Sequence, residues 1–251
     1  KRTVENGVVV LFEGTSGHVV AVVEAGSITA IRPPAASAVA TDLFARPESS
    51  QLAILGAGHQ AQGHLAAIIK VRNIKQVNVW SLNIESAKAF AEQASSQHDM
   101  CVTACETVEQ AVQDMDIVCT CTSASEPILK YEWLASGTHV NAIGSSIPMT
   151  AEIDNDSVAN SIFFVDHIDT IKVQGGEFRR ALEAGVIGED HIQAELGEIL
   201  LGQHPGRKSD QEITLYKSVG IVAYDLMAAH ATYQAALESG LRVDVELLRD
   251  A

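Results

Sequence analysis

The stretch QLAILGAGHQAQGHL, residues 51–65, constrains the fold more than any other part of the sequence. A short apolar run ends at Gly56 and Gly58, and the following residues have a helical rather than an alternating pattern, which predicts a strand that turns sharply into a helix. Together with Ala61 these glycines form G-x-G-x-x-A. The first glycine permits the tight turn, the second lets the backbone approach a pyrophosphate, and the small third residue allows close packing of helix on strand.

The residues that follow the turn also suit a phosphate ligand. His59 and Gln60 open the predicted helix, and a helix start offers free N–H groups and a partial positive charge to phosphates. We therefore predict that residues 56–61 bind a dinucleotide; the alternative is a purely structural glycine turn.

The pattern beyond this turn alternates strands and helices. Such alternation predicts parallel βαβ units and a Rossmann-like, doubly wound α/β sheet. The expected strands are 52–55, 76–80, 101–104, 116–121, 138–143 and 162–165, and the expected helices are 59–71, 84–97 and 107–113.

The flanking segments predict other elements. Residues 8–12 and 19–24 are β-rich runs around EGTSG, typical of a hairpin. An extended piece is expected next, then a helix that begins near Pro33-Pro34 and stops before Pro47. EFRRALEAG and IQAELGEILLG each predict a helix, and the segment from ITLYK starts as a strand and continues as an alanine-rich helix to about Gly240.

Composition narrows the class of partner. The net charge of −15 would repel phosphate backbones and anionic lipid surfaces, which favours small molecules and protein partners over nucleic acid or membrane. No apolar run approaches the roughly 18 to 20 residues of a membrane span, and with no visible secretory signal we expect a cytoplasmic protein. The four cysteines are expected to be buried thiols, and no metal site is predicted because His59 and His64 are five residues apart.

The end of the second strand bears on the choice of cofactor. NAD-binding proteins of this type usually place a carboxylate there for the ribose hydroxyl, whereas this sequence has Ser81 and Asn83. A carboxylate that would repel a 2′-phosphate is absent, so we expect NADP or NAD with NADP slightly favoured. No arginine is adjacent, and Lys88 is the nearest cation.

Several separated motifs together resemble the ornithine cyclodeaminase and mu-crystallin family. They are LFEGTSGHVVAVVEAGSITAIR, LAILGAGHQA, GTHVNAIGSSIP, AELGEILLGQHPGR and ITLYKSVGIVAYDLMAA, and they cover nearly the whole chain. The resemblance implies a Rossmann domain at 47–205 and a smaller α+β dimerisation domain from both chain ends, 1–46 and 206–251. It also implies a homodimer and a chain that extends upstream of Lys1.

The resemblance also assigns roles to two residues. Arg32 matches the arginine that grips an amino-acid carboxylate in the family, although the family's RTAA reads RPPA here; without the resemblance, a surface salt bridge would be the better interpretation. Ser146 stands where ornithine cyclodeaminases have an aspartate for deamination. Mu-crystallin-like ketimine reductases carry serine there, so the resemblance favours their chemistry.

Further residues are expected near the nicotinamide by the same analogy: Asn141, Gly144, Ser218 and Gly220. Glu152 and Asp154 are expected at a helix start, and His139 in the core. The proton donor is expected upstream of Lys1, because Lys217 is a weak substitute for the family's lysine.

The function expected from all of this is an NAD(P)H-dependent reductase of small cyclic imine carboxylates such as pyrroline-2-carboxylate or piperideine-2-carboxylate. Alternatives are an ornithine cyclodeaminase, an alanine dehydrogenase-like oxidoreductase, and a non-enzymatic binding or structural protein.

Overall fold

The computed structural model describes residues 7–244, which fall into two compact units. Unit 1 combines both chain ends, 1–32 and 222–251, and unit 2 is residues 33–221. These limits differ from the expected 46/47 and 205/206. The reason is that residues 38–45 pack on the large sheet and residues 214–217 form one of its central strands, so both segments belong to unit 2.

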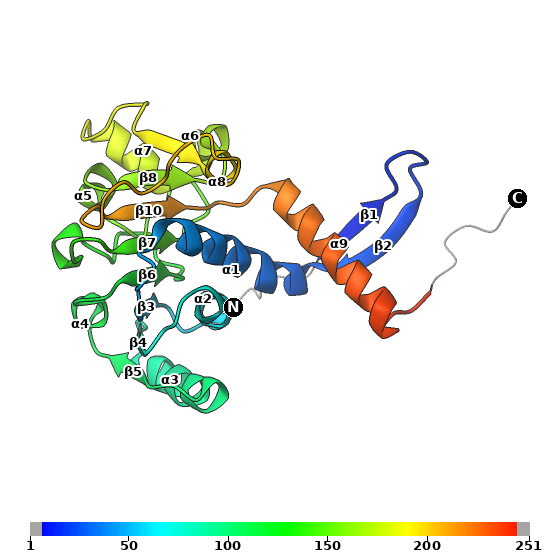
Figure 1. Ribbon diagram of the computed structural model, residues 1–251, viewed down its shortest axis with the longest axis horizontal. Helices are drawn as coiled ribbons and strands as arrows, with labels where there is room; N and C mark the ends of the chain where they lie inside the picture. The colour runs from blue at the N-terminus through cyan, green and yellow to red at the C-terminus, as the bar shows by residue number, and fades with distance from the viewer. Residues whose placement is uncertain (1–6, 245–251) are drawn as a thin grey trace, which may run out of the picture. The chain divides into compact units, whose positions relative to one another are not determined.

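Unit 2 contains an eight-stranded sheet in the order β5-β4-β3-β6-β7-β10-β8-β9, and every neighbouring pair is parallel (Figure 1). The strands are β3 (Gln51–Leu55), β4 (Gln76–Trp80), β5 (Val102–Cys105), β6 (Ile117–Thr120), β7 (His139–Ala142), β8 (Ile162–Val165), β9 (Ile192–Glu195) and β10 (Thr214–Lys217). The predicted doubly wound parallel sheet is confirmed. Its strand order reverses between β3 and β6, the switch point at which such sheets bind ligands.

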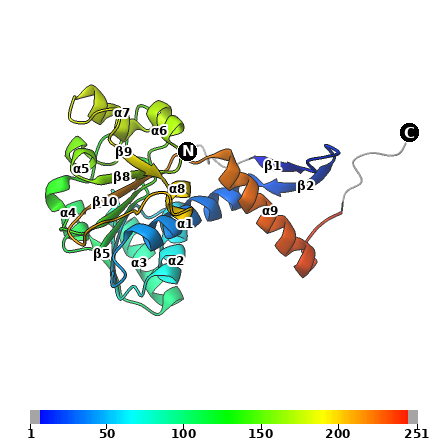
Figure 2. The same ribbon diagram turned by 45° about the horizontal axis from the view of Figure 1, so that its top comes forward.

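Helices cover both faces of this sheet (Figure 2). The second half of α1 packs on one face with α2, α3 and α8, whereas α4, α5, α6 and α7 pack on the other. The helices are α1 (Ala25–Phe44), α2 (His59–Val71), α3 (Ile84–His98), α4 (Val108–Val112), α5 (Asn155–Ala159), α6 (Ile168–Gln174), α7 (Gly176–Glu183) and α8 (Leu196–Leu200).

Strand β3 shows why the sequence encodes such a layer. Leu52 and Ile54 belong to the core beside α2 and α3, and Ala53 and Leu55 belong to the core beside α4. All four are fully buried because both faces of the strand are covered. The unbroken apolar run before Gly56 is therefore the signature of a parallel strand in mid-sheet.

Unit 1 is an antiparallel hairpin, β1 (Val8–Phe12) and β2 (Val19–Glu24), with the first turns of α1 and with α9 (Val222–Ser239). Leu11, Ile28 and Ala229 form its small core. The other face of the hairpin exposes a row of apolar side chains: Val8, Val10, Phe12, Val20 and Val22.

Two expectations about local structure were wrong. Helix α1 begins at Ala25 rather than near the prolines, because the Glu24 carboxylate accepts hydrogen bonds from the N–H groups of Gly26 and Ser27 and caps it. Pro33 and Pro34 lie inside the helix and are buried. Residues 192–195, expected to be helical, form edge strand β9 and pair with β8.

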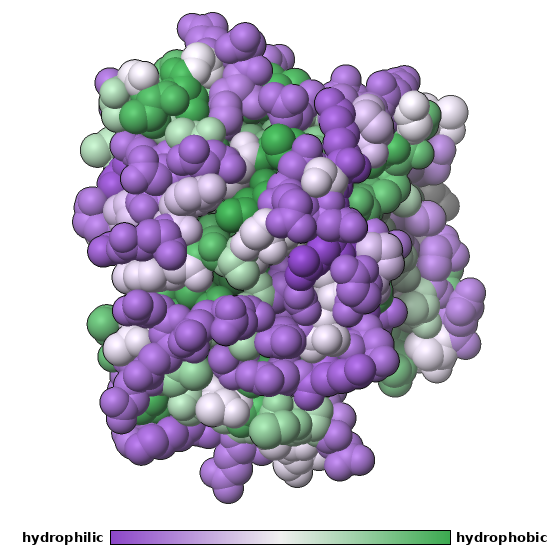
Figure 3. Space-filling model, turned by 60° about the vertical axis from the view of Figure 1, so that its left-hand side comes forward, coloured by the Kyte–Doolittle hydropathy of each residue, from purple (hydrophilic) through white to green (hydrophobic). Residues whose placement is uncertain are grey.

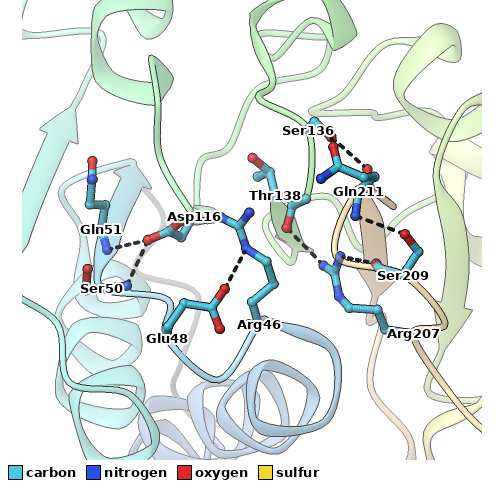
Figure 4. Close-up of polar contacts among 12 residues, drawn as sticks. Arg46, Glu48, Ser50, Gln51, Asp116, Ser136, Thr138, Arg207, Ser209 and Gln211 are labelled. Carbon is cyan, nitrogen blue, oxygen red and sulfur yellow. Dashed lines mark hydrogen bonds and ion pairs between the residues drawn. The ribbon is translucent and has the colours of Figure 1, made fainter.

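Arginines fasten the carboxyl end of α1 at the amino-terminal edge of the sheet (Figure 4). Arg207 donates to the carbonyls of Phe44, Gly137 and Glu212, and Arg46 pairs with Asp116. A third arginine, Arg72, donates to the carbonyls of Thr41, Asp42 and Ala45. The last carbonyls of a helix have no partner within the helix, and Arg72 and Arg207 satisfy those of α1.

The face shown in Figure 3 is mostly hydrophilic, with apolar side chains in small patches. Within residues 7–244, no helix is long and apolar enough to cross a membrane. Over the same residues, the acidic, cysteine and histidine side chains make no group that could hold a metal ion.

Candidate active site

The carboxyl ends of six neighbouring strands of unit 2 end in one row. In the register of the sheet, Leu55 pairs with Trp80 and with Thr120. The row continues through Ala142, Lys217 and Val165. The loops that follow these residues therefore share one edge. These loops, together with the first turn of α2, contain every residue of unit 2 that the sequence assigned to the cofactor or substrate, except Asn141, which lies inside β7.

The two glycines of the first loop are required for different reasons. Gly56 has φ +120°, and a Cβ there would meet the Cys121 carbonyl oxygen at 2.5 Å, so the packing of the β3 and β6 loops itself excludes a side chain. Gly58 has φ −96°, and a Cβ there would meet nothing within 4 Å. Nothing in the fold excludes a side chain at Gly58. Its bare backbone borders open space, which fits a phosphate group that approaches closely.

The start of α2 completes this loop. Gly58 is the N-cap and provides no side-chain cap, so the first N–H groups of α2, beginning at His59, have no acceptor from that residue. Ala61 is fully buried against β3, as expected for a small packing residue. His64 links α2 to α1: its imidazole lies 3.0 Å from the Ser37 hydroxyl of α1 and 2.7 Å from the Gln60 carbonyl of its own helix.

The loop after β4 carries the residues that the sequence analysis linked to the choice between NAD and NADP. Ser81 is partly exposed there, and Leu82 is 93% exposed. Asn83 is the N-cap of α3, and its side chain accepts a hydrogen bond from the Glu85 N–H. Lys88 lies 2.9 Å from the Glu85 carboxylate, and this contact raises the pKa of Lys88. The nearest cation is thus partly neutralised, and the amide of Asn83 has a structural task.

A buried carboxylate joins the loops after β6 and β7. Glu152 is fully buried, and its two carboxylate oxygens accept four hydrogen bonds of 2.6 to 2.7 Å. The donors are the Thr120 hydroxyl, the hydroxyl and N–H of Thr122, and the Gly144 N–H. A Cβ on Gly144 would meet the Thr122 carbonyl at 2.1 Å, so this glycine is required by close packing. The expectation that Glu152 starts a helix was wrong; Asp154 does so, as the N-cap of α5.

The two serines that follow Gly144 lie in different environments. Ser145 is buried, and its hydroxyl donates to the Thr150 carbonyl at 2.6 Å, whereas Ser146 is exposed. The Ser145 carbonyl accepts a hydrogen bond from Nζ of Lys217, which also lies 3.1 and 3.0 Å from the two carboxylate oxygens of Glu177. Ser146 therefore projects from a peptide that is anchored on its amino side.

Asp166, which follows β8, shapes the third loop of the edge. One of its oxygens accepts hydrogen bonds from the Ser218 hydroxyl at 2.8 Å, the Val219 N–H at 3.1 Å and the Gly220 N–H at 2.7 Å. Gly220 has φ +84°, a conformation that favours glycine. The expected residues Ser218 and Gly220 are thus held at the edge by a carboxylate that is itself 3% exposed.

Asn141, expected near the nicotinamide, lies inside β7. Its side chain is fully buried, and its amide donates to the Thr41 hydroxyl of α1 at 3.0 Å. This placement makes Asn141 a link between α1 and the sheet. His139 is a buried core histidine, as predicted: it lies 2.9 Å from the Thr214 hydroxyl, and burial lowers its pKa to about 3.

In unit 1, Arg32 is held by an acid. Its Nε donates to Asp225 of α9 at 2.8 Å, and the arginine side chain is 18% exposed. The two terminal nitrogens, which form the edge that grips carboxylates in pairs, take no part in this bond. The salt bridge that was the alternative interpretation of Arg32 is thus present, although the arginine is only partly exposed. The same ion pair orients the guanidinium.

The four cysteines are all free thiols. Cys105 and Cys119 are buried, as expected, whereas Cys101 is exposed. Burial raises the pKa of Cys119 to about 12, which keeps this thiol protonated.

The model of the ornithine cyclodeaminase/mu-crystallin family matches residues 2–240. The chain belongs to this family. The motifs on which the resemblance was based all lie within this match, and they include the edge loops that carry Gly56, Gly144 and Gly220 and the helix of Arg32.

Individual members with known names or structures are similar over most of their length. The chain is 33% identical over 247 residues to the Delta(1)-pyrroline-2-carboxylate reductase of Bacillus cereus (strain ATCC 10987 / NRS 248), which covers 98% of this chain and 75% of that protein. The structure of Thermococcus litoralis Delta(1)-pyrroline-2-carboxylate reductase with NADH and L-proline superimposes with a TM-score of 0.92 at 38% identity, over 94% of this chain and 73% of that one. An archaeal alanine dehydrogenase dimer with bound NAD gives a TM-score of 0.90 at 30% identity, over 96% and 74%.

Sequence reasoning missed the buried charges of the edge. Asp166 and Glu177 were not singled out, and Glu152 and Lys217 were given other roles. One signal was available for Lys217, since a lysine that ends the apolar run ITLY in a buried strand requires a buried partner.

Proposed function

We propose that the protein is an NAD(P)H-dependent reductase of small cyclic imine carboxylates, such as pyrroline-2-carboxylate or piperideine-2-carboxylate. One observation carries the proposal: Gly58 has no side chain although the fold leaves room for one there. This glycine lies at the switch point of the sheet, and the chain belongs to the family named above. The two structural relatives described above have NADH or NAD bound, and one of them also has L-proline.

The residues of the edge would then have the following tasks. The loop from Gly56 to Ala61 holds the pyrophosphate with backbone N–H groups, and the loops carrying Gly144 and Ser218 border the nicotinamide. The reduced nicotinamide supplies the hydride for the imine carbon. For Arg32, which belongs to unit 1, we propose from the family resemblance that its terminal nitrogens hold a substrate carboxylate, while Asp225 fixes the guanidinium through Nε.

Ser146 separates the reductase from the cyclodeaminase alternative. A serine hydroxyl lacks the negative charge and basicity of the aspartate found in ornithine cyclodeaminases, so it suits orientation of substrate or water better than deamination. Lys217 is a poor proton donor for the imine nitrogen because it is fully buried and is bonded to Ser145 and Glu177.

For the cofactor we propose a weak preference for NADPH over NADH. Ser81 and Asn83 present no carboxylate to repel a 2′-phosphate, yet Lys88 is paired with Glu85 and Asn83 caps α3. Attraction to the phosphate then depends on the Ser81 hydroxyl and on the start of α3, which supports a small difference between the two cofactors.

We also propose a homodimer that forms through unit 1. The outer face of the hairpin carries five exposed apolar residues with no cover from unit 1 itself, and a two-stranded sheet is marginal in isolation. Helix α9 adds Leu226 and Met227, which are 53% and 65% exposed.

The test of the function is NAD(P)H oxidation with both cyclic imines, and ammonia release from ornithine, by the protein and by Arg32→Ala. Loss of the two-pronged bond should lower kcat/KM by roughly 30- to 1000-fold, which is on the order of 2 to 4 kcal/mol. The dissociation constant of the cofactor should stay the same, as measured by quenching of intrinsic fluorescence. Efficient ammonia release from ornithine, with both imines ignored, would replace the reductase by a cyclodeaminase.

A further inference from the structure

The pair Lys217 and Glu177 is a buried ion pair, and it lies at the edge that carries the candidate site. Lys217 ends β10 between β7 and β8, and Glu177 lies in the first turn of α7. Lys217 is fully buried, and Glu177 is 1% exposed. Removing two charges from water costs several kcal/mol each, and replacement of such pairs by apolar residues is often neutral or stabilising. A gain in folding stability is therefore a weak explanation for the presence of this buried ion pair.

The contacts of the pair point to the loop that presents Ser146. Lys217 Nζ donates to the Ser145 carbonyl, so it fixes the peptide that joins Ser145 to Ser146. An ammonium group with its four-carbon stem reaches this carbonyl from inside the sheet, where backbone N–H groups are used by the strands. Glu177 in turn holds the ammonium at 3.0 and 3.1 Å.

Glu177 also continues the network toward the neighbouring loop. Its Oε1 accepts a hydrogen bond from the Glu152 N–H at 3.1 Å, and the Glu152 side chain holds Thr120, Thr122 and Gly144. The approach of α7 is close, because a Cβ on Gly176 would meet the Thr150 carbonyl at 1.9 Å. One chain of contacts thus connects the ends of β10, β7 and β6.

We propose that Lys217 and Glu177 are positioning residues, which hold residues 143–150 and, through Glu152, the loop after β6 in the arrangement that reduction requires. This inference rests on the proposed function for its kinetic consequence, but the ordering of residues 143–150 is a property of the protein without substrate. Neither residue is assigned a contact with cofactor or substrate.

The decisive variant is the pair Lys217→Met with Glu177→Gln, which removes both charges and keeps similar volumes. We expect amide hydrogen exchange of residues 143–150, measured by mass spectrometry, to become about tenfold faster or more, which corresponds to about 1.4 kcal/mol of lost local protection. Exchange of residues 51–55 should not change. With imine substrate, kcat should fall while the dissociation constant of the cofactor changes less than kcat.

Asp116→Asn is a matched control at the opposite edge. Asp116 pairs with Arg46 and accepts from the N–H groups of Ser50 and Gln51, so its loss should lower the melting temperature without faster exchange at 143–150. If the paired variant fails to fold, Glu177→Gln alone decides, because it keeps the shape and one acceptor oxygen and should still raise exchange in that segment.

Exchange at 143–150 equal to that of the unchanged protein, in a folded variant lacking the ion pair, would overturn the inference. Faster exchange confined to that segment would support it. Absence of imine reduction in the unchanged protein would overturn the proposed function instead, and the exchange comparison would still decide the positioning role.

Discussion

Replacement of each glycine in the cofactor loop by alanine should separate a glycine required for folding from one required for binding. At Gly56 an alanine would take φ +120° with its Cβ 2.5 Å from the Cys121 carbonyl. Strain of about 1 to 3 kcal/mol for the backbone and a comparable amount for displacement of the β6 loop give a loss on the order of 3 kcal/mol. For a domain of this size that is roughly 6 to 12 °C in melting temperature.

Gly58→Ala should behave in the opposite way. Its φ of −96° is ordinary and the new methyl group meets nothing, so stability should change by less than about 1 kcal/mol, the scale of an N-cap substitution. The methyl group would occupy the space that we propose for the pyrophosphate. We expect at least about a tenfold weaker NADH and NADPH complex, equivalent to about 1.4 kcal/mol.

The assay combines urea unfolding followed by circular dichroism with titration of NADH fluorescence. Gly197→Ala serves as control, because a Cβ in this α8 position also meets nothing and lies far along the chain from the loop. It should leave cofactor binding unchanged. Wild-type cofactor affinity in Gly58→Ala, or wild-type stability in Gly56→Ala, would refute the assignment of the two roles.

Three other predictions concern the cofactor, the assembly and pH. Ser81→Asp should shift the ratio of NADPH to NADH dissociation constants at least about tenfold toward NADH by repulsion of the 2′-phosphate, and an unchanged ratio in calorimetric titration would place the phosphate elsewhere. Sedimentation at micromolar concentration should show a dimer that Phe12→Asp weakens; a stable unmodified monomer contradicts the proposed interface. Burial lowers the pKa of His64 from 6.5 to about 4, so the unfolded chain binds the proton first and stability falls as pH drops below 6.5. Urea midpoints should show a loss of about 2 kcal/mol from this group between pH 7.5 and 5, and the loss should shrink in His64→Gln.

The parts of the fold that could be predicted are those whose cause is local. The strand of residues 76–80, the helix of residues 59–71 and the hairpin have the predicted limits, because apolar periodicity and turn residues decide them within a few positions. Strand β9 was missed because IQAELGEILLG has helical periodicity, and pairing with β8 overrides it for the first four residues. The start of α1 was missed since two prolines suggested a helix start, whereas Glu24 supplies a cap nine residues earlier.

For the candidate site, the sequence pointed to residues of the carboxyl edge but not to the buried residues that support them. Gly56, Gly144 and Ser218 lie at the carboxyl edge of the sheet because each directly or closely follows a strand whose apolar run is visible. Their supports are distant in the chain: Asp166 is 52 residues from Ser218, and Glu177 is 40 from Lys217. No periodicity within a window of ten or twenty residues reports such a pairing.

Whether such a distant supporting residue is acidic or basic nevertheless follows from the geometry of a parallel sheet. At the carboxyl edge, loops and helix starts direct N–H groups into the site, so buried acceptors are required, and Glu152 and Asp166 provide them. At the amino edge, the end of α1 leaves carbonyls without partners, and Arg72 and Arg207 donate to them. A buried acid in such a sequence is therefore expected to shape the ligand edge, and a buried arginine the opposite one. Lys217 is the exception, a buried cation at the carboxyl edge, and it requires Glu177 for that reason.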